Sequence, residues 1–163
     1  MIKRQLGVGT FTLVFFFMLA ALGSTIPSFA ETMGGVTQEK SLYERLGGYD
    51  AISAVVDVFL TKVWEDPVVG RFFVGMGTDT RNQLRQKNKN LICATTGGPC
   101  EIINRPLDQA HIGLGITDKE FDIVAGHLGT TLQEFKVPQK EYDELMTKVG
   151  SLRSYVVEAR IKK

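Results

Sequence analysis

Residues 50–63, Asp-Ala-Ile-Ser-Ala-Val-Val-Asp-Val-Phe-Leu-Thr-Lys-Val, decide the fold class. Their apolar side chains recur at i, i+3, i+4, i+7, i+8 and i+11, which places them on one side of a helix and does not match the two-residue period of a strand. These positions are Ile52, Val55, Val56, Phe59, Leu60 and Val63. We predict a buried helix over residues 50–65, capped at its start by Asp50.

Breaking signals lie on both sides of this helix. Ser41-Leu42-Tyr43-Glu44 is a capping box that opens a short helix, and Gly47-Gly48 ends that helix. Asp66-Pro67 ends the long helix and starts a short turn that leads to Phe72-Phe73. The chain is thus predicted to consist of helices joined by short connections.

Three more long helices are predicted, over residues 79–95, 117–135 and 138–158. The first carries an exposed polar side, and the second opens with a capping box at Thr117-Asp118-Lys119-Glu120. Their expected core side chains are Leu84, Leu91, Ile92 and Cys93, then Phe121, Val124, Leu128, Leu132 and Phe135, then Tyr142, Leu145, Met146, Val149, Leu152 and Val156; the expected exposed polar side chains are Arg81, Asn82, Arg85, Gln86 and Lys89. Residues 96–116 are predicted to be mostly irregular, with one turn at Leu107–His111. The prediction is an all-α domain with one core and helix pairs packed face to face.

The N-terminus carries an export signal. Residues 5–30 have no charged side chain, follow Lys3 and Arg4, and end in Pro27-Ser28-Phe29-Ala30. We predict a signal peptide over residues 1–30 cleaved after Ala30, a flexible leader over 31–40 and one domain over 41–160. The alternative is an uncleaved membrane anchor through residues 5–26. The expected location is periplasmic or otherwise outside the cytoplasm, with membrane anchoring as the alternative.

The charge balance speaks against nucleic acid as a partner. The 163 residues contain 19 Lys and Arg and 18 Asp and Glu, a formal net charge of +1. Removing residues 1–30 removes two basic residues and leaves a net charge of −1. A nucleic-acid-binding protein usually carries a basic face.

Two cysteines, Cys93 and Cys100, flank Gly97-Gly98-Pro99. In an exported protein such a pair can form a disulfide, but neither the sequence nor the spacing decides whether it does. We leave both states open.

Only two histidines are present, and they differ in context. His127 lies inside a predicted helix, where we expect it to be satisfied by a neighbouring group. His111 lies in the irregular segment, next to Gly113 and Gly115, and is a candidate ligand. Motifs for a nucleophilic serine, a phosphate loop or a zinc protease are absent from the sequence. Any chemistry would therefore depend on a bound cofactor.

The sequence resembles the group I truncated haemoglobins over roughly residues 41–158. The resemblance is carried by the order and spacing of several short motifs. They are Leu42-Tyr43-Glu44-Arg45-Leu46-Gly47-Gly48, Val56-Asp57-Val58-Phe59, Asp66-Pro67, Phe72-Phe73, Gly97-Gly98-Pro99, Arg105, Ala110-His111 with Gly113, Gly115, Ile116 and Thr117, and Phe121 with Val124-Ala125 and His127-Leu128. It implies a shortened globin, a two-over-two helical sandwich that encloses haem b with one iron.

The resemblance also implies roles for individual residues. His111 matches the proximal ligand of the haem iron, and Phe73, with its neighbour Phe72, matches the aromatic position that packs on the porphyrin. Further pocket walls are expected at Leu107, Phe121, Val124 and Val149, where ordinary core packing would give the same residue types.

On the distal side the sequence departs from the family. Leu60 stands where the family usually has a tyrosine that donates a hydrogen bond to bound dioxygen, and Leu84 stands at a position that is often glutamine. Asn88 is the remaining polar candidate, beside the apolar Leu91. Lys87 matches a position from which some relatives supply a sixth iron ligand, whereas a haem propionate partner or a solvated surface lysine is the simpler alternative.

The resemblance implies reversible binding of diatomic gases, namely oxygen, nitric oxide and carbon monoxide. The alternatives are an electron-transfer or gas-sensing protein with six-coordinate iron, and a nitric oxide dioxygenase or peroxidase-like enzyme. The expected partners are a diatomic gas and an unidentified electron donor. Without the distal tyrosine, oxygen is expected to bind less tightly.

Overall fold

The computed structural model describes residues 39–103 and 105–158. The export signal predicted over 1–30, and the leader up to residue 38, lie outside these residues. Within the described ranges there is no strand. No helix in this part of the chain is long and apolar enough to cross a membrane.

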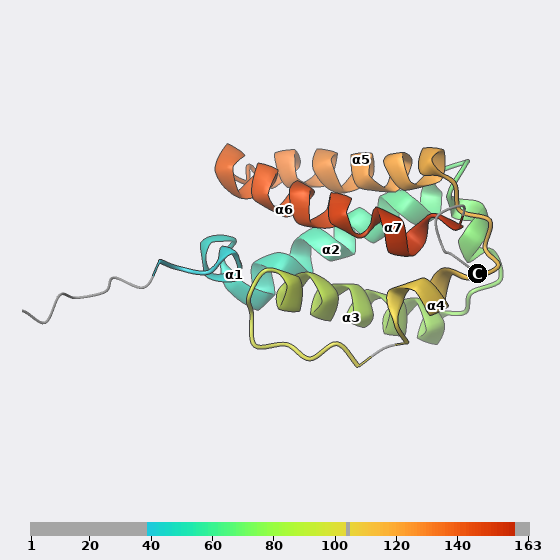
Figure 1. Cartoon of the computed structure of the whole chain (residues 1–163), viewed down its shortest axis with the longest axis horizontal. Helices are drawn as coiled ribbons and strands as arrows, with labels where there is room; N and C mark the ends of the chain where they lie inside the picture. Colours follow the sequence, from blue (N-terminus) through green and yellow to red (C-terminus); the bar gives the residue numbers. More distant parts are fainter. Residues whose placement is uncertain (1–38, 104, 159–163) are drawn as a thin grey trace, which may run out of the picture. The chain divides into compact units, whose positions relative to one another are not determined.

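The described residues form two helix pairs, which confirms the all-α prediction. α2 packs against α3 on one side and against α5 on the other, and α5 packs against α6. Figure 1 shows α5 and α6 together in one layer and α3 with α4 in the opposite layer. The elements are α1 (Leu42–Arg45), α2 (Gly48–Glu65), the 3-10 helix η1 (Gly70–Phe73), α3 (Thr78–Thr95), α4 (Leu107–His111), α5 (Asp118–Glu134), α6 (Gln139–Ser151) and α7 (Arg153–Val156).

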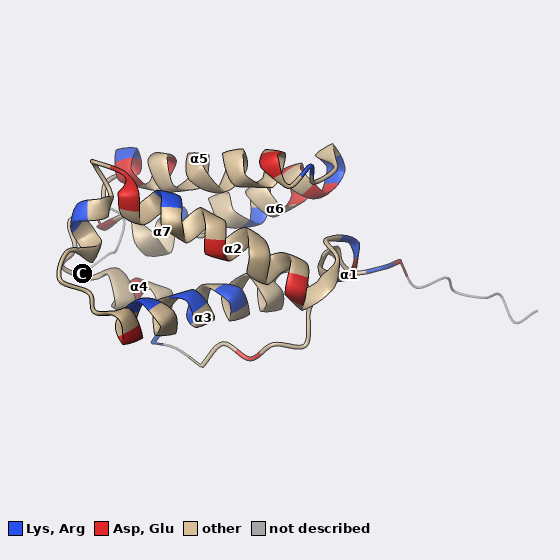
Figure 2. Ribbon diagram, turned by 180° about the vertical axis from the view of Figure 1, so that it is seen from behind, with Lys and Arg blue, Asp and Glu red and all other residues tan. Residues whose placement is uncertain are grey.

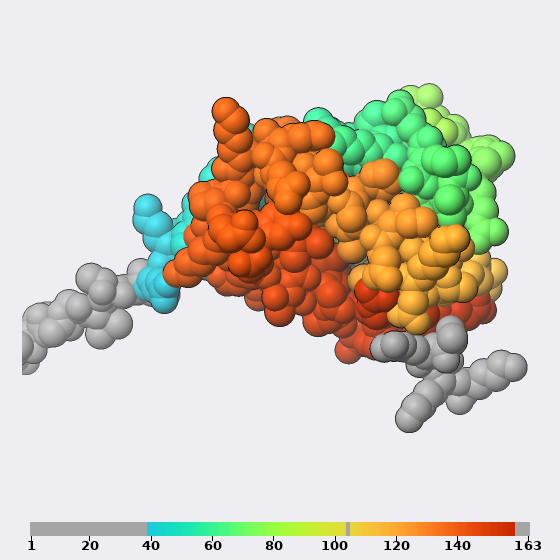
Figure 3. Space-filling model, turned by 90° about the horizontal axis from the view of Figure 1, so that it is seen from above, coloured from blue at the N-terminus to red at the C-terminus, as the bar shows by residue number. Residues whose placement is uncertain are grey.

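α2 supplies the centre of the core. All but one of its predicted inward positions are buried, and Val55 is partly buried. The core is completed by buried residues from α1, α5, α6 and the turn before η1, namely Leu42, Val69, Leu128, Leu132 and Leu145. α5 and α6 cover one face of the domain, with the α2 and η1 surfaces beside them (Figure 3).

The prediction that Asp50 caps α2 is wrong. The helix begins two residues earlier, at Gly48, and its N-cap is Gly47. Gly47 has a φ of 94°, a left-handed conformation that glycine adopts without strain, so the chain turns directly from α1 into α2. Asp50 lies in the first turn, where its charge still favours the helix dipole.

Two predictions near the end of the chain are also wrong. Phe135 is 42% exposed, because α5 ends at Glu134 and Phe135 is its C-cap. The last helix is interrupted at Leu152, which separates α6 from α7. A tight turn, in which the Leu152 N–H donates to the carbonyl oxygen of Val149 at 3.0 Å, replaces regular helix there.

Basic residues of α3 contact α2, contrary to the prediction that they face solvent. The Lys89 ammonium lies 2.9 Å from a carboxylate oxygen of Asp57. The guanidinium carbons of Arg81 and Arg85 lie 5.2 and 4.6 Å from the ring centroid of Trp64. These three basic side chains are half-buried, and Figure 2 shows the Lys and Arg positions following one another along α3. α3 therefore rests on α2 through ion pairs and cation–π contacts.

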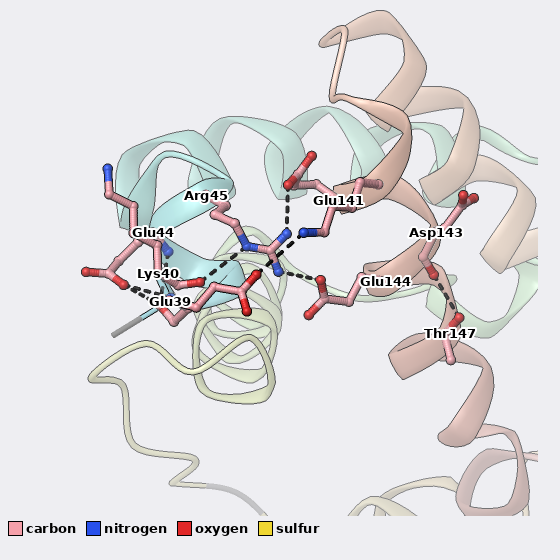
Figure 4. A network of polar contacts seen from close by, with 10 residues as sticks. Glu39, Lys40, Glu44, Arg45, Glu141, Asp143, Glu144 and Thr147 are labelled. Carbon is pink, nitrogen blue, oxygen red and sulfur yellow. Dashed lines mark hydrogen bonds and ion pairs between the residues drawn. The ribbon is translucent and has the colours of Figure 1, made fainter. Parts of the chain in front are cut away.

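Arg45 ties the start of the domain to α6 (Figure 4). Its guanidinium lies 2.7 Å from Glu141 and also contacts Glu144. The Arg45 hydrogen bond lowers the pKa of Glu141. A carboxyl whose folded pKa is lowered stabilises the fold above its ordinary pKa, and this contribution is lost as the pH falls through the folded pKa.

We therefore expect Arg45→Met to lower the melting temperature at pH 7 by several degrees, because it leaves Glu141 buried without its cation. The difference from the natural protein should shrink as the pH falls below the ordinary pKa of a glutamic acid and through the lowered pKa of Glu141, where the carboxylate becomes protonated. Circular dichroism melting curves at several pH values measure both. Lys140→Met is the matched control, since Lys140 is exposed, pairs with Glu39 at 3.5 Å and lowers the pKa of Glu141 less than Arg45 does. A constant difference between pH 7 and pH 3 would contradict this account.

Cys93 and Cys100 form a disulfide, which settles the question that the sequence leaves open. The bond joins the end of α3 to the irregular segment that leads to α4. Gly98 lies inside this closed loop, and a Cβ there would be 2.5 Å from the ring of Tyr43 and 2.7 Å from Sγ of Cys93. Only glycine fits at that position.

Replacing both cysteines with alanine is expected to lower the free energy of unfolding by roughly 2–3 kcal/mol, the value for a closed loop of this size. Urea denaturation with and without a reductant measures the effect. The reductant should destabilise the natural protein by a similar amount and leave the double variant unchanged. An equal response of both proteins to the reductant would refute a stabilising role for the bond.

Candidate functional site

His111 is the last residue of α4 and is half-buried. Its Nδ1 lies 2.6 Å from the carbonyl oxygen of Leu107, one helical turn earlier. Because a carbonyl oxygen only accepts hydrogen bonds, Nδ1 carries a proton, and in the neutral form of the ring Nε2 carries the lone pair. The backbone carbonyl thus orients the imidazole, as supports of metal-ligating histidines commonly do.

The predicted apolar walls differ in how completely they are buried. Leu60 and Phe121 are buried, with 3% and 8% of their surface exposed. Phe72, Phe73, Val124 and Val149 pack against the core cluster that contains Leu60 but remain partly exposed. Leu84 and Leu91 on α3 and Leu107 on α4 are partly exposed as well.

These residues fit a haem group. At His111 the described chain offers an imidazole whose Nδ1 is held by a backbone carbonyl. Partly exposed apolar side chains come from η1, α3, α4, α5 and α6, beside the buried Leu60 of α2 and Phe121 of α5. A porphyrin needs this combination, because its faces are apolar and its iron takes an axial nitrogen ligand. The structure brings Leu60, Phe72, Phe73, Val124 and Val149 together in one cluster.

The polar distal candidates lie on α3. The side-chain amide of Asn88 donates to the carbonyl oxygen of Leu84 at 2.9 Å, which uses one of its two N–H groups. Lys87 is exposed. Contact of Asn88 or Lys87 with the iron or with its ligand therefore stays a prediction.

His127 has the structural role expected of it. Its Nε2 lies 2.8 Å from a carboxylate oxygen of Asp66. Asp66 also accepts hydrogen bonds from the backbone N–H groups of Val68 and Val69. The Val69 N–H, followed by His127 and Val68, lowers the pKa of Asp66.

The sequence did not point to the residues that hold the segment after His111. Glu158, near the end of the chain, accepts hydrogen bonds from the backbone N–H groups of Gly113 and Gly115. Arg153 pairs with Asp118 at 2.8 Å and lies 4.4 Å from the ring centroid of Phe121, a predicted wall residue. No sequence signal indicates the Glu158 contacts, because they join residues more than 40 positions apart. The hydrogen bond between His111 and the Leu107 carbonyl oxygen, by contrast, could have been inferred from the i, i+4 spacing of the two residues.

Comparison with known proteins gives the family. Residues 41–158 match the family described as bacterial-like globin. The chain belongs to the group 1 truncated haemoglobins. It is 35% identical to the group 1 truncated hemoglobin GlbN of Mycolicibacterium paratuberculosis over 112 residues, 69% of this chain and 80% of the relative. It is also 35% identical to the group 1 truncated hemoglobin LI410 of Chlamydomonas moewusii over 119 residues, 72% of this chain and 68% of the relative.

Solved structures of this family confirm the two-over-two fold. The truncated hemoglobin of Tetrahymena pyriformis in the Fe(III) form is 28% identical, with a TM-score of 0.67 over 72% of this chain and 98% of that one. The 2/2 hemoglobin of Synechococcus sp. PCC 7002, in the cyanomet state and with covalently attached heme, is 35% identical. Its TM-score is 0.66 over 76% of this chain and all of the other. The truncated haemoglobins are a haem-binding family, so the family and the imidazole geometry agree.

Proposed function

We propose that this globin reversibly binds a diatomic gas, such as oxygen, nitric oxide or carbon monoxide, at the iron of haem b held by His111. The observation that carries the proposal is the His111 imidazole, with Nδ1 bonded to the Leu107 carbonyl oxygen and Nε2 available. When bound, the haem would supply the iron that takes the gas. The apolar side chains around it keep water away and hold the porphyrin by burial.

The distal side of the proposed site is mostly apolar. Leu60 cannot donate a hydrogen bond, and one amide N–H of Asn88 is used by the Leu84 carbonyl oxygen. Peroxide cleavage is helped by a positioned general acid–base group, which Leu60 does not provide and which the Asn88 amide provides poorly. The side chains therefore favour gas binding over turnover, and carbon monoxide and nitric oxide depend on distal hydrogen bonds less than oxygen does.

Absorption spectra of the purified, haem-loaded protein test the proposal. We expect a five-coordinate ferrous spectrum that changes when carbon monoxide is added. Lys87→Ala should leave the ferric and ferrous spectra unchanged, because Lys87 is exposed. A low-spin spectrum that becomes high-spin in Lys87→Ala would instead assign Lys87 as a sixth ligand and favour electron transfer or sensing. A purified protein that takes up no haem would refute the proposal.

We also propose that the protein is exported through residues 1–30. The Cys93–Cys100 disulfide supports this, because disulfides persist in oxidising compartments and are rare in the cytosol. Cell fractionation should place the protein outside the cytoplasm, and its mature N-terminus should begin at Glu31. Recovery in the membrane with residue 1 intact would favour the anchor, and recovery in the cytosol would refute export.

A further inference from the structure

We propose that Glu158 is a positioning residue for His111, an inference that rests on the function proposed above. The carboxylate lies at the C-terminal end of the described chain, and it holds the backbone immediately after the candidate ligand. One oxygen accepts from the Gly113 N–H at 3.3 Å and the other from the Gly115 N–H at 2.5 Å. Glu158 thus anchors the chain two and four residues beyond His111.

The helix that carries His111 needs such an anchor. α4 has five residues, and its N-cap residue, Pro106, makes no side-chain hydrogen bond to the start of the helix. A helix this short has little stability of its own and takes its orientation from tertiary contacts. α4 packs against α7, so the C-terminal segment is the element that can orient it.

The segment after α4 has few contacts of its own. Gly113 and Gly115 have φ values of 81° and 64°, left-handed conformations that place their N–H groups where a carboxylate can reach both. Ile112 and Leu114 are 59% and 44% exposed, so apolar packing holds the segment weakly. Two charge-assisted hydrogen bonds from one carboxylate are therefore a large part of what fixes it.

Glu158 is itself held in place. Its backbone N–H donates to the carbonyl oxygen of Ile116 at 3.0 Å, and the preceding Val157 is fully buried. Arg153, at the start of α7, pairs with Asp118 and Asp122 of α5. α7 and the connection between α4 and α5 lie at the same end of the domain (Figure 1). These contacts hold Glu158 in place, and its carboxylate in turn holds the segment that follows His111.

The test uses the haem-loaded protein and three variants, Glu158→Ala, Glu158→Gln and the control Glu134→Ala. Glu134, the last residue of α5, is an exposed carboxylate that pairs with Lys62 at 2.6 Å. Haem transfer to apomyoglobin gives the dissociation rate, and resonance Raman spectroscopy of the ferrous protein reports the iron–histidine stretch. Amide hydrogen exchange of Gly113 and Gly115 reports the hold of the carboxylate independently of haem.

We expect Glu158→Ala to accelerate haem loss about 5- to 30-fold, to shift and broaden the iron–histidine band and to speed exchange at both glycines. Glu158→Gln keeps one accepting oxygen and should give a smaller change in the same direction, whereas Glu134→Ala should match the natural protein. Faster glycine exchange with an unchanged band and unchanged haem loss would overturn the positioning role alone. Retention of haem by a His111→Ala variant would instead overturn the ligand assignment on which it rests.

Discussion

A His111→Ala variant is expected to lose stable haem binding almost completely. In the proposed site His111 is the proximal ligand of the iron, and its Nδ1–H bond to the Leu107 carbonyl oxygen leaves Nε2 to bind the metal. Alanine removes the iron–nitrogen bond and leaves only apolar contacts to retain the porphyrin. The ratio of haem to protein absorbance after gel filtration measures the loss.

His127→Ala is the matched control, because it removes the other histidine of the chain. It should retain haem and lose some thermal stability, since Asp66 would keep its two backbone N–H donors but lose its imidazole partner. His111→Gly with added imidazole should recover a haem spectrum, as the free ligand can occupy the vacated position. If His111→Ala elutes with a full complement of haem, the proximal assignment is incorrect.

The second large effect is expected from Leu60→Tyr, which should slow oxygen dissociation about 5- to 150-fold. Leu60 is 3% exposed and belongs to the core cluster that includes Phe72, Phe73 and Val149. A buried, charge-assisted hydrogen bond contributes about 1–3 kcal/mol. Since each 1.4 kcal/mol is a factor of ten, the expected change follows directly.

Stopped-flow measurement of oxygen release from the ferrous protein gives the rate. Leu60→Phe is the control, because it has nearly the shape of tyrosine and lacks the hydroxyl. It should release oxygen at close to the natural rate, and both variants should bind carbon monoxide with similar affinity. Equal oxygen release from Leu60→Tyr and Leu60→Phe would show that the hydroxyl at this position does not reach the ligand.

The helices could be predicted because their signals are local. The capping boxes at Ser41 and Thr117 formed as expected, and the apolar spacing of α2 placed its core positions correctly. The Leu107–His111 turn is also observed, as α4. The predicted N-cap of α2 was wrong because of the residues just before the helix. Gly47 replaced the Asp50 cap because a left-handed glycine let the helix start early.

The candidate site was less predictable, because its supports are distant in sequence. The apolar walls and His111 followed from residue type and from the family resemblance. The sequence places the basic residues of α3 in solvent, where charged residues usually lie. They are Arg81, Arg85 and Lys89. Their partners, Asp57 and Trp64, are on α2, so no local pattern indicates the contacts. Glu158 was missed for the same reason, since only the return of the chain brings it to Gly113 and Gly115.

The Asp57–Lys89 ion pair helps to hold α3 on α2. Because α3 is one wall of the proposed pocket, the position of this wall depends on ionic strength. At physiological salt the Debye length is about 8 Å, so the 2.9 Å Asp57–Lys89 pair is little screened, whereas at about 1 M salt the length falls to about 3 Å and the pair weakens. Apolar packing such as that between α2 and α5 does not depend on this screening. Concentrated salt should thus loosen the helix carrying Leu84, Asn88 and Leu91 while the rest of the core stays closed.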